Sequence, residues 1–128
     1  MHLCDYAFAA DGGKQCLIGI FTVIHAQSFP ATHPQMVVAV EFTGAPHERI
    51  SVRVELMRPE GDSLASIDGE IIINADGRAN LSCNLLNLAF PEPGRYTVNI
   101  SAGDRILASR TLRLLLMQTP QPPSGVVH

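Results

Sequence analysis

The sequence predicts an all-β protein, an antiparallel β-sandwich of about eight strands with an immunoglobulin-like or related Greek-key arrangement. Short apolar runs of strand length follow one another along the 128 residues, with turn-forming residues between them. No segment keeps a helical period for more than two turns. In the segment 91–96, two prolines and Gly94 lead directly into Tyr96. A tyrosine at such a corner is typical of the penultimate strand of immunoglobulin-like sandwiches.

The first two strands are predicted at residues 3–9 and 15–24, with a hairpin turn at Asp11-Gly12-Gly13 between them. The second run is apolar on both sides, which suits a central strand or a strand in an interface. Gly19 interrupts this run and predicts a bulge or a close backbone approach.

A long loop is predicted over residues 25–35, because this stretch contains Pro30 and Pro34 and has little periodicity. Strands are expected on both sides of the next turn, at 36–42 and 50–56. The run 50–56 alternates most clearly between apolar and polar residues, so one of its faces is expected to lie on the core.

The residues 64–74 and 78–84 are predicted to pair as a hairpin around Asp76-Gly77, a dipeptide typical of tight hairpin turns. The stretch 85–90 fits either a short helical turn or extended chain.

A terminal hairpin is predicted from residues 95–100 and 105–117 around a turn at 101–104. Arg110 shares the phase of the inward-facing residues in the last strand. Because burial of an unpaired arginine is costly, a bulge or a turn is expected there. The residues with the inward phase are Tyr96, Val98, Ile100, Leu112, Leu114 and Leu116.

One domain is expected over residues 1–117, followed by a flexible proline-rich tail at 118–128. Only 16% of the residues are charged, and Lys14 is the sole lysine. The mean hydropathy is +0.16. A tight two-layer core under a serine, threonine and asparagine surface would account for this excess of apolar residues. A homo-oligomer that buries one sheet face would do so as well, and we favour the oligomer.

Nucleic acid and membrane are not expected among the partners. The net charge is −3, and the eight arginines form no run that could neutralise a phosphate backbone or an anionic membrane surface. The apolar runs of the chain, such as that at residues 114–117, are far too short to cross a bilayer.

The N-terminal residues do not resemble a signal peptide, so a cytoplasmic location is expected. Cys4, Cys16 and Cys83 are then expected to be buried, reduced thiols.

Four short motifs in this order resemble a bacterial family of small proteins known as a domain of unknown function. They are Cys4-Asp5-Tyr6-Ala7, Gly12-Gly13-Lys14, Ile18-Gly19-Ile20-Phe21 and Pro93-Gly94-Arg95-Tyr96. The resemblance spans the domain without the tail. It implies a β-sandwich in a bacterial cytoplasm, and it implies no activity, substrate or catalytic residue.

Histidines are the only candidate ligand-binding residues. His25 and His33 share the predicted loop, whereas His47, in the next turn, is expected at the opposite end of the sandwich. His2 and Cys4 could begin a metal site, but no second pair of ligands accompanies them. The acidic turns near Asp62 and Asp76 supply too few carboxylates for calcium. No metal or cofactor is therefore expected.

The sequence contains no nucleophile motif of the Gly-x-Ser-x-Gly kind and no phosphate-binding loop. The favoured function is a non-catalytic protein-interaction or scaffold module that self-associates through an apolar sheet face. The alternative is a sandwich that binds a small ligand or carbohydrate through the 25–35 loop. The third interpretation is an enzyme of unrecognised type.

Overall fold

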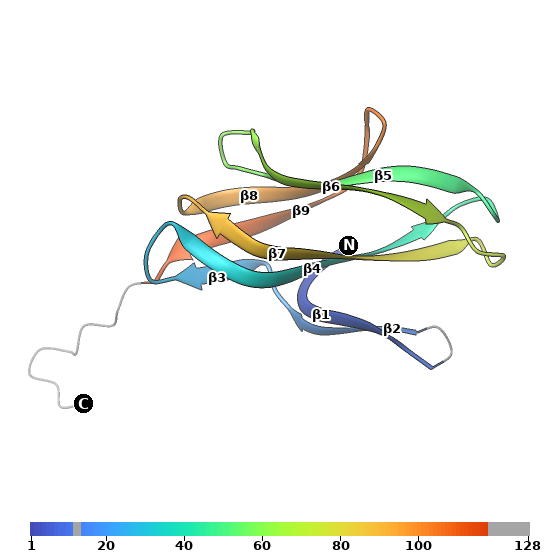
Figure 1. Cartoon of the computed structure of the whole chain (residues 1–128), viewed down its shortest axis with the longest axis horizontal. Coiled ribbons are helices and arrows are strands. Elements are labelled where there is room, and N and C mark those ends of the chain that lie inside the picture. The colour runs from blue at the N-terminus through green and yellow to red at the C-terminus, as the bar shows by residue number, and fades with distance from the viewer. Residues whose placement is uncertain (12–13, 118–128) are drawn as a thin grey trace, which may run out of the picture.

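The computed structural model describes residues 1–11 and 14–117, and in these ranges it contains nine β-strands and no helix (Figure 1). The strands are β1 (His2–Ala10), β2 (Lys14–Ile20), β3 (Val23–Ala26), β4 (Ala31–Thr43), β5 (Arg49–Met57), β6 (Ser63–Ile72), β7 (Arg78–Phe90), β8 (Gly94–Ala102) and β9 (Arg105–Leu116). The predicted tail at 118–128 lies outside the described residues.

The strands form two sheets that face each other. One sheet has the order β2-β1-β4-β7, and the other has the order β3-β9-β8-β5-β6. Figure 1 shows the two sheets as stacked layers, with the β1–β2 hairpin extending below β4 and β7. The predicted all-β sandwich is confirmed, although the number of strands is one larger than expected.

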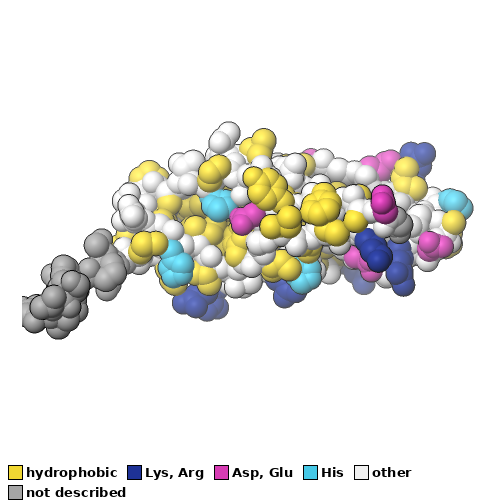
Figure 2. Space-filling view, turned by 90° about the horizontal axis from the view of Figure 1, so that it is seen from below, with side chains coloured by type: hydrophobic (Ala, Val, Ile, Leu, Met, Phe, Trp, Pro, Cys, Tyr) yellow, Lys and Arg dark blue, Asp and Glu magenta, His cyan; other side chains and the backbone are white. Residues whose placement is uncertain are grey.

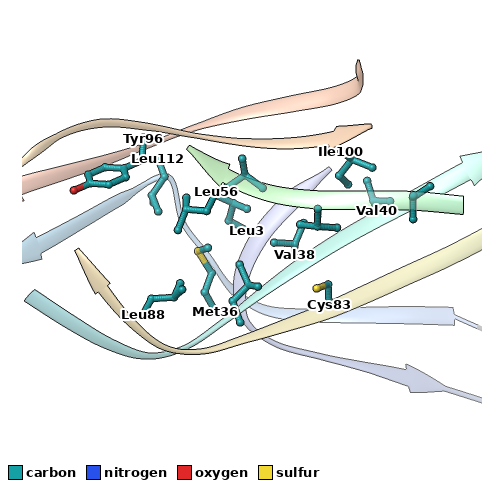
Figure 3. Close-up of a cluster of buried hydrophobic side chains, with 14 of the residues drawn as sticks. Leu3, Met36, Val38, Val40, Leu56, Cys83, Leu88, Tyr96, Ile100 and Leu112 are labelled. Carbon is teal, nitrogen blue, oxygen red and sulfur yellow. The ribbon is translucent and has the colours of Figure 1, made fainter. Parts of the chain in front are cut away.

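The core fills the space between the two sheets (Figure 3). The alternation predicted for residues 50–56 is confirmed, because the side chains of β5 that face in are buried: Val52, Val54 and Leu56. The inward phase predicted for β8 and β9 holds for Tyr96, Val98, Ile100, Leu112 and Leu114. It is wrong for Leu116, which is 55% exposed because the strand extends beyond the core at this end.

The predicted single strand at 15–24 is wrong. The strand β2 ends at Ile20, the chain crosses between the sheets at Phe21 and Thr22, and β3 then pairs with β9 in the other sheet. The amide of Phe21 donates to the carbonyl oxygen of Leu3 at 2.9 Å, which holds the crossing against β1. Because β3 runs parallel to β9, the sandwich is not purely antiparallel.

The predicted long loop at 25–35 is also wrong. Only residues 27–30 connect β3 to β4, and β4 is 13 residues long. Pro34 has no amide hydrogen to contribute to a ladder. The pairing of β4 with β7 skips this residue, beside Asn87 with its φ of 52°. This local irregularity lets a proline lie within a paired strand.

The predicted hairpin of residues 64–74 with 78–84 does not form. The strand β6 pairs with β5, and β7 pairs with β4 in the opposite sheet. The turn at Asp76-Gly77 does exist, since the Asn74 side chain accepts hydrogen bonds from the amides of Asp76 and Arg78. It carries the chain from one sheet to the other. The ambiguous stretch 85–90 is extended and belongs to β7.

Arg110 lies within the regular ladder, opposite Val98, and the expected bulge or turn is not there. The register shift between β8 and β9 falls between Ile100 and Ser101 instead. The Arg110 side chain remains exposed, and its Nε donates to the carbonyl oxygen of Met1 at 2.7 Å. The arginine therefore avoids burial by reaching the edge of the sheet.

The corner before β8 is built as its sequence predicts. The hydroxyl of Tyr96 donates to the carbonyl oxygen of Glu92 at 2.7 Å, and the ring is completely buried. The ring of Phe90 meets it edge-on, with 5.0 Å between the ring centroids. Burial raises the pKa of the Tyr96 hydroxyl. The hydroxyl therefore stays protonated, and able to donate, throughout the neutral range.

Candidate functional site

The β1–β2 hairpin forms a third layer below the sandwich. Its inner side carries Ala7 and Leu17, which pack against the outer surface of the β4 sheet at Val37 and Ala39. Gln15 on β2 donates through Nε2 to the hydroxyl of Ser82 on β7 at 2.7 Å, although these two strands are not neighbours in the sheet. The hairpin therefore folds across the outer surface of β4 and β7. This second cover explains why β4 is apolar on both faces.

The outer side of the hairpin carries a group of large apolar residues. The register places Tyr6 opposite Ile18 and Phe8 opposite Cys16, and Ile20 lies opposite Cys4. We call the surface formed by the following residues the hairpin face: Tyr6, Phe8, Cys16, Ile18 and Ile20. Cys4 does not belong to it, because it is completely buried where the hairpin leaves the sheet.

The hairpin face is strongly exposed. Tyr6 is 59% exposed, Ile20 is 56% exposed and Ile18 is 52% exposed, with Phe8 close behind at 50%. Figure 2 views the molecule from below, from the side on which the hairpin lies in Figure 1, and shows hydrophobic side chains gathered in the middle of this surface. Exposed apolar residues on a monomer are usually scattered, so a contiguous group of this size is an uncommon feature.

The sequence around Gly19 fits the shape of the hairpin. Gly19 has a φ of 72°, and a Cβ atom at this position would lie 2.9 Å from Cγ of Asp5 and would clash with Oδ2 of the same side chain. The predicted close approach is confirmed, and its partner is the Asp5 side chain on the neighbouring strand. Glycine is therefore the residue that lets the hairpin bend here.

The histidines predicted as weak ligand candidates are partly brought together. His25 on β3 and His33 on β4 line one shallow hollow at the end of the sandwich, next to Phe90. The Nε2 atom of His33 is buried without a hydrogen-bond partner in the described structure, and its ring lies 5.6 Å from that of Phe21. His47 lies beyond the far end of β4, as predicted. Ligand binding in this hollow stays a prediction.

Metal-binding side chains do not gather in the described part of the chain. No group of three histidine, cysteine or acidic residues there could hold an ion. In the acidic turn after β5, Arg58 occupies the centre and forms ion pairs of 3.3–3.6 Å with Glu60, Asp62 and Glu92. A guanidinium in this place competes directly with a calcium ion, so this turn serves the structure of the corner.

The three thiols are free and differ in exposure. Cys4 and Cys83 are buried as predicted, whereas Cys16 on the hairpin face is partly exposed. Burial is the main cause that raises the pKa of Cys4 and of Cys83, and the Asp5 carboxylate raises that of Cys4 further. The thiolate is the reactive form of cysteine. These two thiols therefore react slowly for two reasons: reagents cannot reach them, and the raised pKa keeps them protonated.

In a brief reaction of the folded chain with a maleimide, at a dilution where the chain is monomeric, we expect modification of Cys16 alone. Cys4 and Cys83 are expected to react only after unfolding in denaturant. Intact-mass spectrometry followed by peptide mapping measures the number and position of the adducts. If Cys83 in the folded protein is modified as fast as Cys16, the burial of Cys83 in the structure is contradicted.

The residues 1–115 match the model of DUF6941, described as a family of unknown function. The chain belongs to this family. The match to DUF6941 includes the hairpin face, the hollow with both histidines and the corner at Tyr96, and it agrees with the uncharacterised family that the four motifs resemble. No curated protein matches the sequence. No helix in the described ranges is long and apolar enough to span a membrane.

Sequence reasoning missed the hairpin face as a separate surface of this DUF6941 domain. The run 15–24 is apolar on both of its sides. The sequence could not show which of the two sides another layer of the protein would cover. The signal that could have found it is Gly19, since a glycine inside a strand commonly marks a bend. In the structure the hairpin folds across the outer surface of β4 and β7, and its other side remains uncovered.

Proposed function

We propose that this protein is a non-catalytic interaction module that self-associates through the hairpin face. The observation that carries the proposal is the exposure of four large apolar side chains, each by half or more, on one two-stranded surface. The low charge of the chain, with one lysine in 128 residues, supports an arrangement in which part of the surface is covered.

The occupant that fits the hairpin face best is a second copy of the same chain. The five residues that define the face carry no charge, so the face offers no pattern of charges for a charged partner to match. Half-exposed side chains of this size each present about 100 Å² of apolar surface, so four present on the order of 400 Å². An apolar centre of this extent with a polar rim resembles one half of a standard interface of about 800 Å² per partner.

A two-fold arrangement supports the same conclusion. In a symmetric dimer the same patch serves on both subunits, so one apolar surface is sufficient to cover itself. The strand β2 is also an edge of its sheet, and its backbone is not covered by another strand in the described structure. A second hairpin can therefore approach this face, or the edge beside it, without displacing any existing strand.

We also propose that the sandwich is of the immunoglobulin-like kind and that the protein acts in a bacterial cytoplasm. The fold is supported by the parallel pairing of β3 with β9 and by the hydrogen bond from Tyr96 back to Glu92. The free state of all three cysteines is compatible with a reducing compartment.

Light scattering at micromolar concentration is expected to give twice the chain mass of 13.8 kDa. Replacement of Ile18 by aspartate places a charge in the hairpin face. In a symmetric dimer both subunits carry this charge, so two charges enter the interface. We therefore expect the dissociation constant to rise by about 100-fold or more.

The matched control is Ile72→Asp on β6, because Ile72 is 53% exposed and lies on the other sheet. This variant is expected to remain dimeric. Circular dichroism establishes that both variants are folded. A wild-type protein that stays at 13.8 kDa, or a control that dissociates as readily as Ile18→Asp, would refute self-association through this surface.

A further inference from the structure

An open, shallow hollow of about 360 Å³ lies beside β9, where β3 begins. We call it the β9 hollow. Neither a carboxylate nor a large apolar side chain lines it. The lining residues are Thr22, Ser109, Arg110, Thr111 and Arg113. Two guanidinium groups and the hydroxyl groups of Thr22 and Thr111 can donate there, whereas the hydroxyl of Ser109 donates to Oδ1 of Asn99 at 2.7 Å.

The edge of β9 is open at this hollow. The strand β3 pairs with β9 only from Arg113 onwards, and the amide of Arg113 donates to the carbonyl oxygen of Thr22 at 2.9 Å. Backbone groups of alternate residues in a strand point to the same edge. The amides of Ser109 and Thr111 therefore point to the same side as that of Arg113, where none of the described strands lies next to them. They add two N–H donors to the hollow.

The ladder also forces two arginines together. Arg95 on β8 lies directly opposite Arg113. Because the amide of Arg113 points away from β8, this is a non-hydrogen-bonded pair, in which opposite side chains are closest. Like charges that face each other in this way destabilise a sheet. Arg95 does not line the hollow, but an anion bound beside Arg113 would relieve the repulsion between the two guanidinium groups.

These arginines have no counter-charge in the described structure. The ion pairs recorded there involve Arg49, Arg53 and Arg58. Arg110 uses its Nε on the carbonyl oxygen of Met1, which holds the side chain in place and leaves its terminal nitrogens available. Arg110 and Arg113 lie on opposite faces of β9, so they approach the hollow from its two sides.

We propose that the β9 hollow binds a tetrahedral oxyanion, the phosphate group of free phosphate or of a small phosphate ester. Guanidinium groups, hydroxyl groups and backbone amides are the donors that recognise phosphate oxygens. The absence of a lining carboxylate and of a large apolar side chain favours a compact anion over an apolar or cationic ligand. This site is separate from the hairpin face, which belongs to the other sheet.

Calorimetric titration with inorganic phosphate, at an ionic strength held constant with potassium chloride, tests this proposal. We expect one phosphate per chain and a melting temperature that rises with phosphate concentration. The Arg113→Gln variant retains the backbone bond to Thr22 and is expected to bind phosphate about 10-fold more weakly or worse. Titration with phenyl phosphate distinguishes the two sources, since tighter binding of the ester identifies a phosphorylated small molecule.

The matched control is Arg105→Gln, which removes the same charge from the same strand but lies outside the hollow. Its phosphate affinity is expected to stay within about 2-fold of the wild type. The second variant is Arg95→Gln, which is expected to weaken phosphate binding and, without phosphate, to raise the melting temperature. Equal losses in Arg113→Gln and Arg105→Gln, no binding of phosphate, or binding of an acidic peptide in place of phosphate would each overturn the proposal.

Discussion

Replacement of Tyr96 by alanine is expected to lower the free energy of unfolding by about 3–5 kcal/mol, the usual cost of removing a large buried ring. The ring is completely buried and lies edge-on against Phe90. Its hydroxyl is the donor that ties β8 to the backbone of the preceding corner at Glu92. Urea denaturation followed by circular dichroism measures this loss.

The variant Tyr96→Phe separates the hydroxyl from the ring. It keeps the contact with Phe90 and removes both hydrogen bonds between the hydroxyl and the Glu92 backbone, one donated at 2.7 Å and one accepted at 3.4 Å, so a loss of about 1 kcal/mol is expected. A loss below about 1 kcal/mol for Tyr96→Ala would mean that the ring does not support the corner, and it would contradict the structure at this point.

Replacement of Gly94 by alanine is expected to cost about 2–4 kcal/mol, since it adds backbone strain and a steric clash at the same residue. Gly94 has a φ of 145°, a conformation that other residues rarely adopt. A Cβ atom at this position would lie 2.9 Å from Cγ of Pro59, whose ring cannot rotate away. Denaturation in urea measures the change for this variant as well.

The control for this prediction is Gly69→Ala on β6. Gly69 does not have a positive φ, and nothing lies within 4 Å of an added Cβ atom. This change is expected to leave stability unchanged or to raise it by a few tenths of a kcal/mol. If Gly94→Ala costs no more than Gly69→Ala, the corner does not depend on glycine.

The corner was predictable because its contacts are local. The hydrogen bond of Tyr96 reaches back only four residues, to Glu92, so the sequence of the segment 91–96 already contains both partners. The β8–β9 hairpin was predictable for the same reason, since its two strands are joined by a short turn. Local contacts of this kind need no knowledge of the rest of the chain.

The candidate sites were less predictable. The sequence indicated the apolar excess of residues 15–24, and it placed His25 and His33 near each other. It did not reveal the β9 hollow, because Thr22 and Arg113 are 91 positions apart and meet only where β3 pairs with β9. Self-association, the absence of catalysis and the absence of a cofactor stay predictions.

By itself, the sequence determined the all-β class, most of the strands and the faces of β5 and β8, because alternation along a strand reports directly on burial. The partners of β3, β6 and β7 were decided only in the tertiary structure. Turn residues at Asp76-Gly77 specify that the chain reverses, but they do not specify which sheet receives the next strand. The hairpin face also arises at this level, since the bend at Gly19 covers one side of β1 and β2 and leaves the other side exposed.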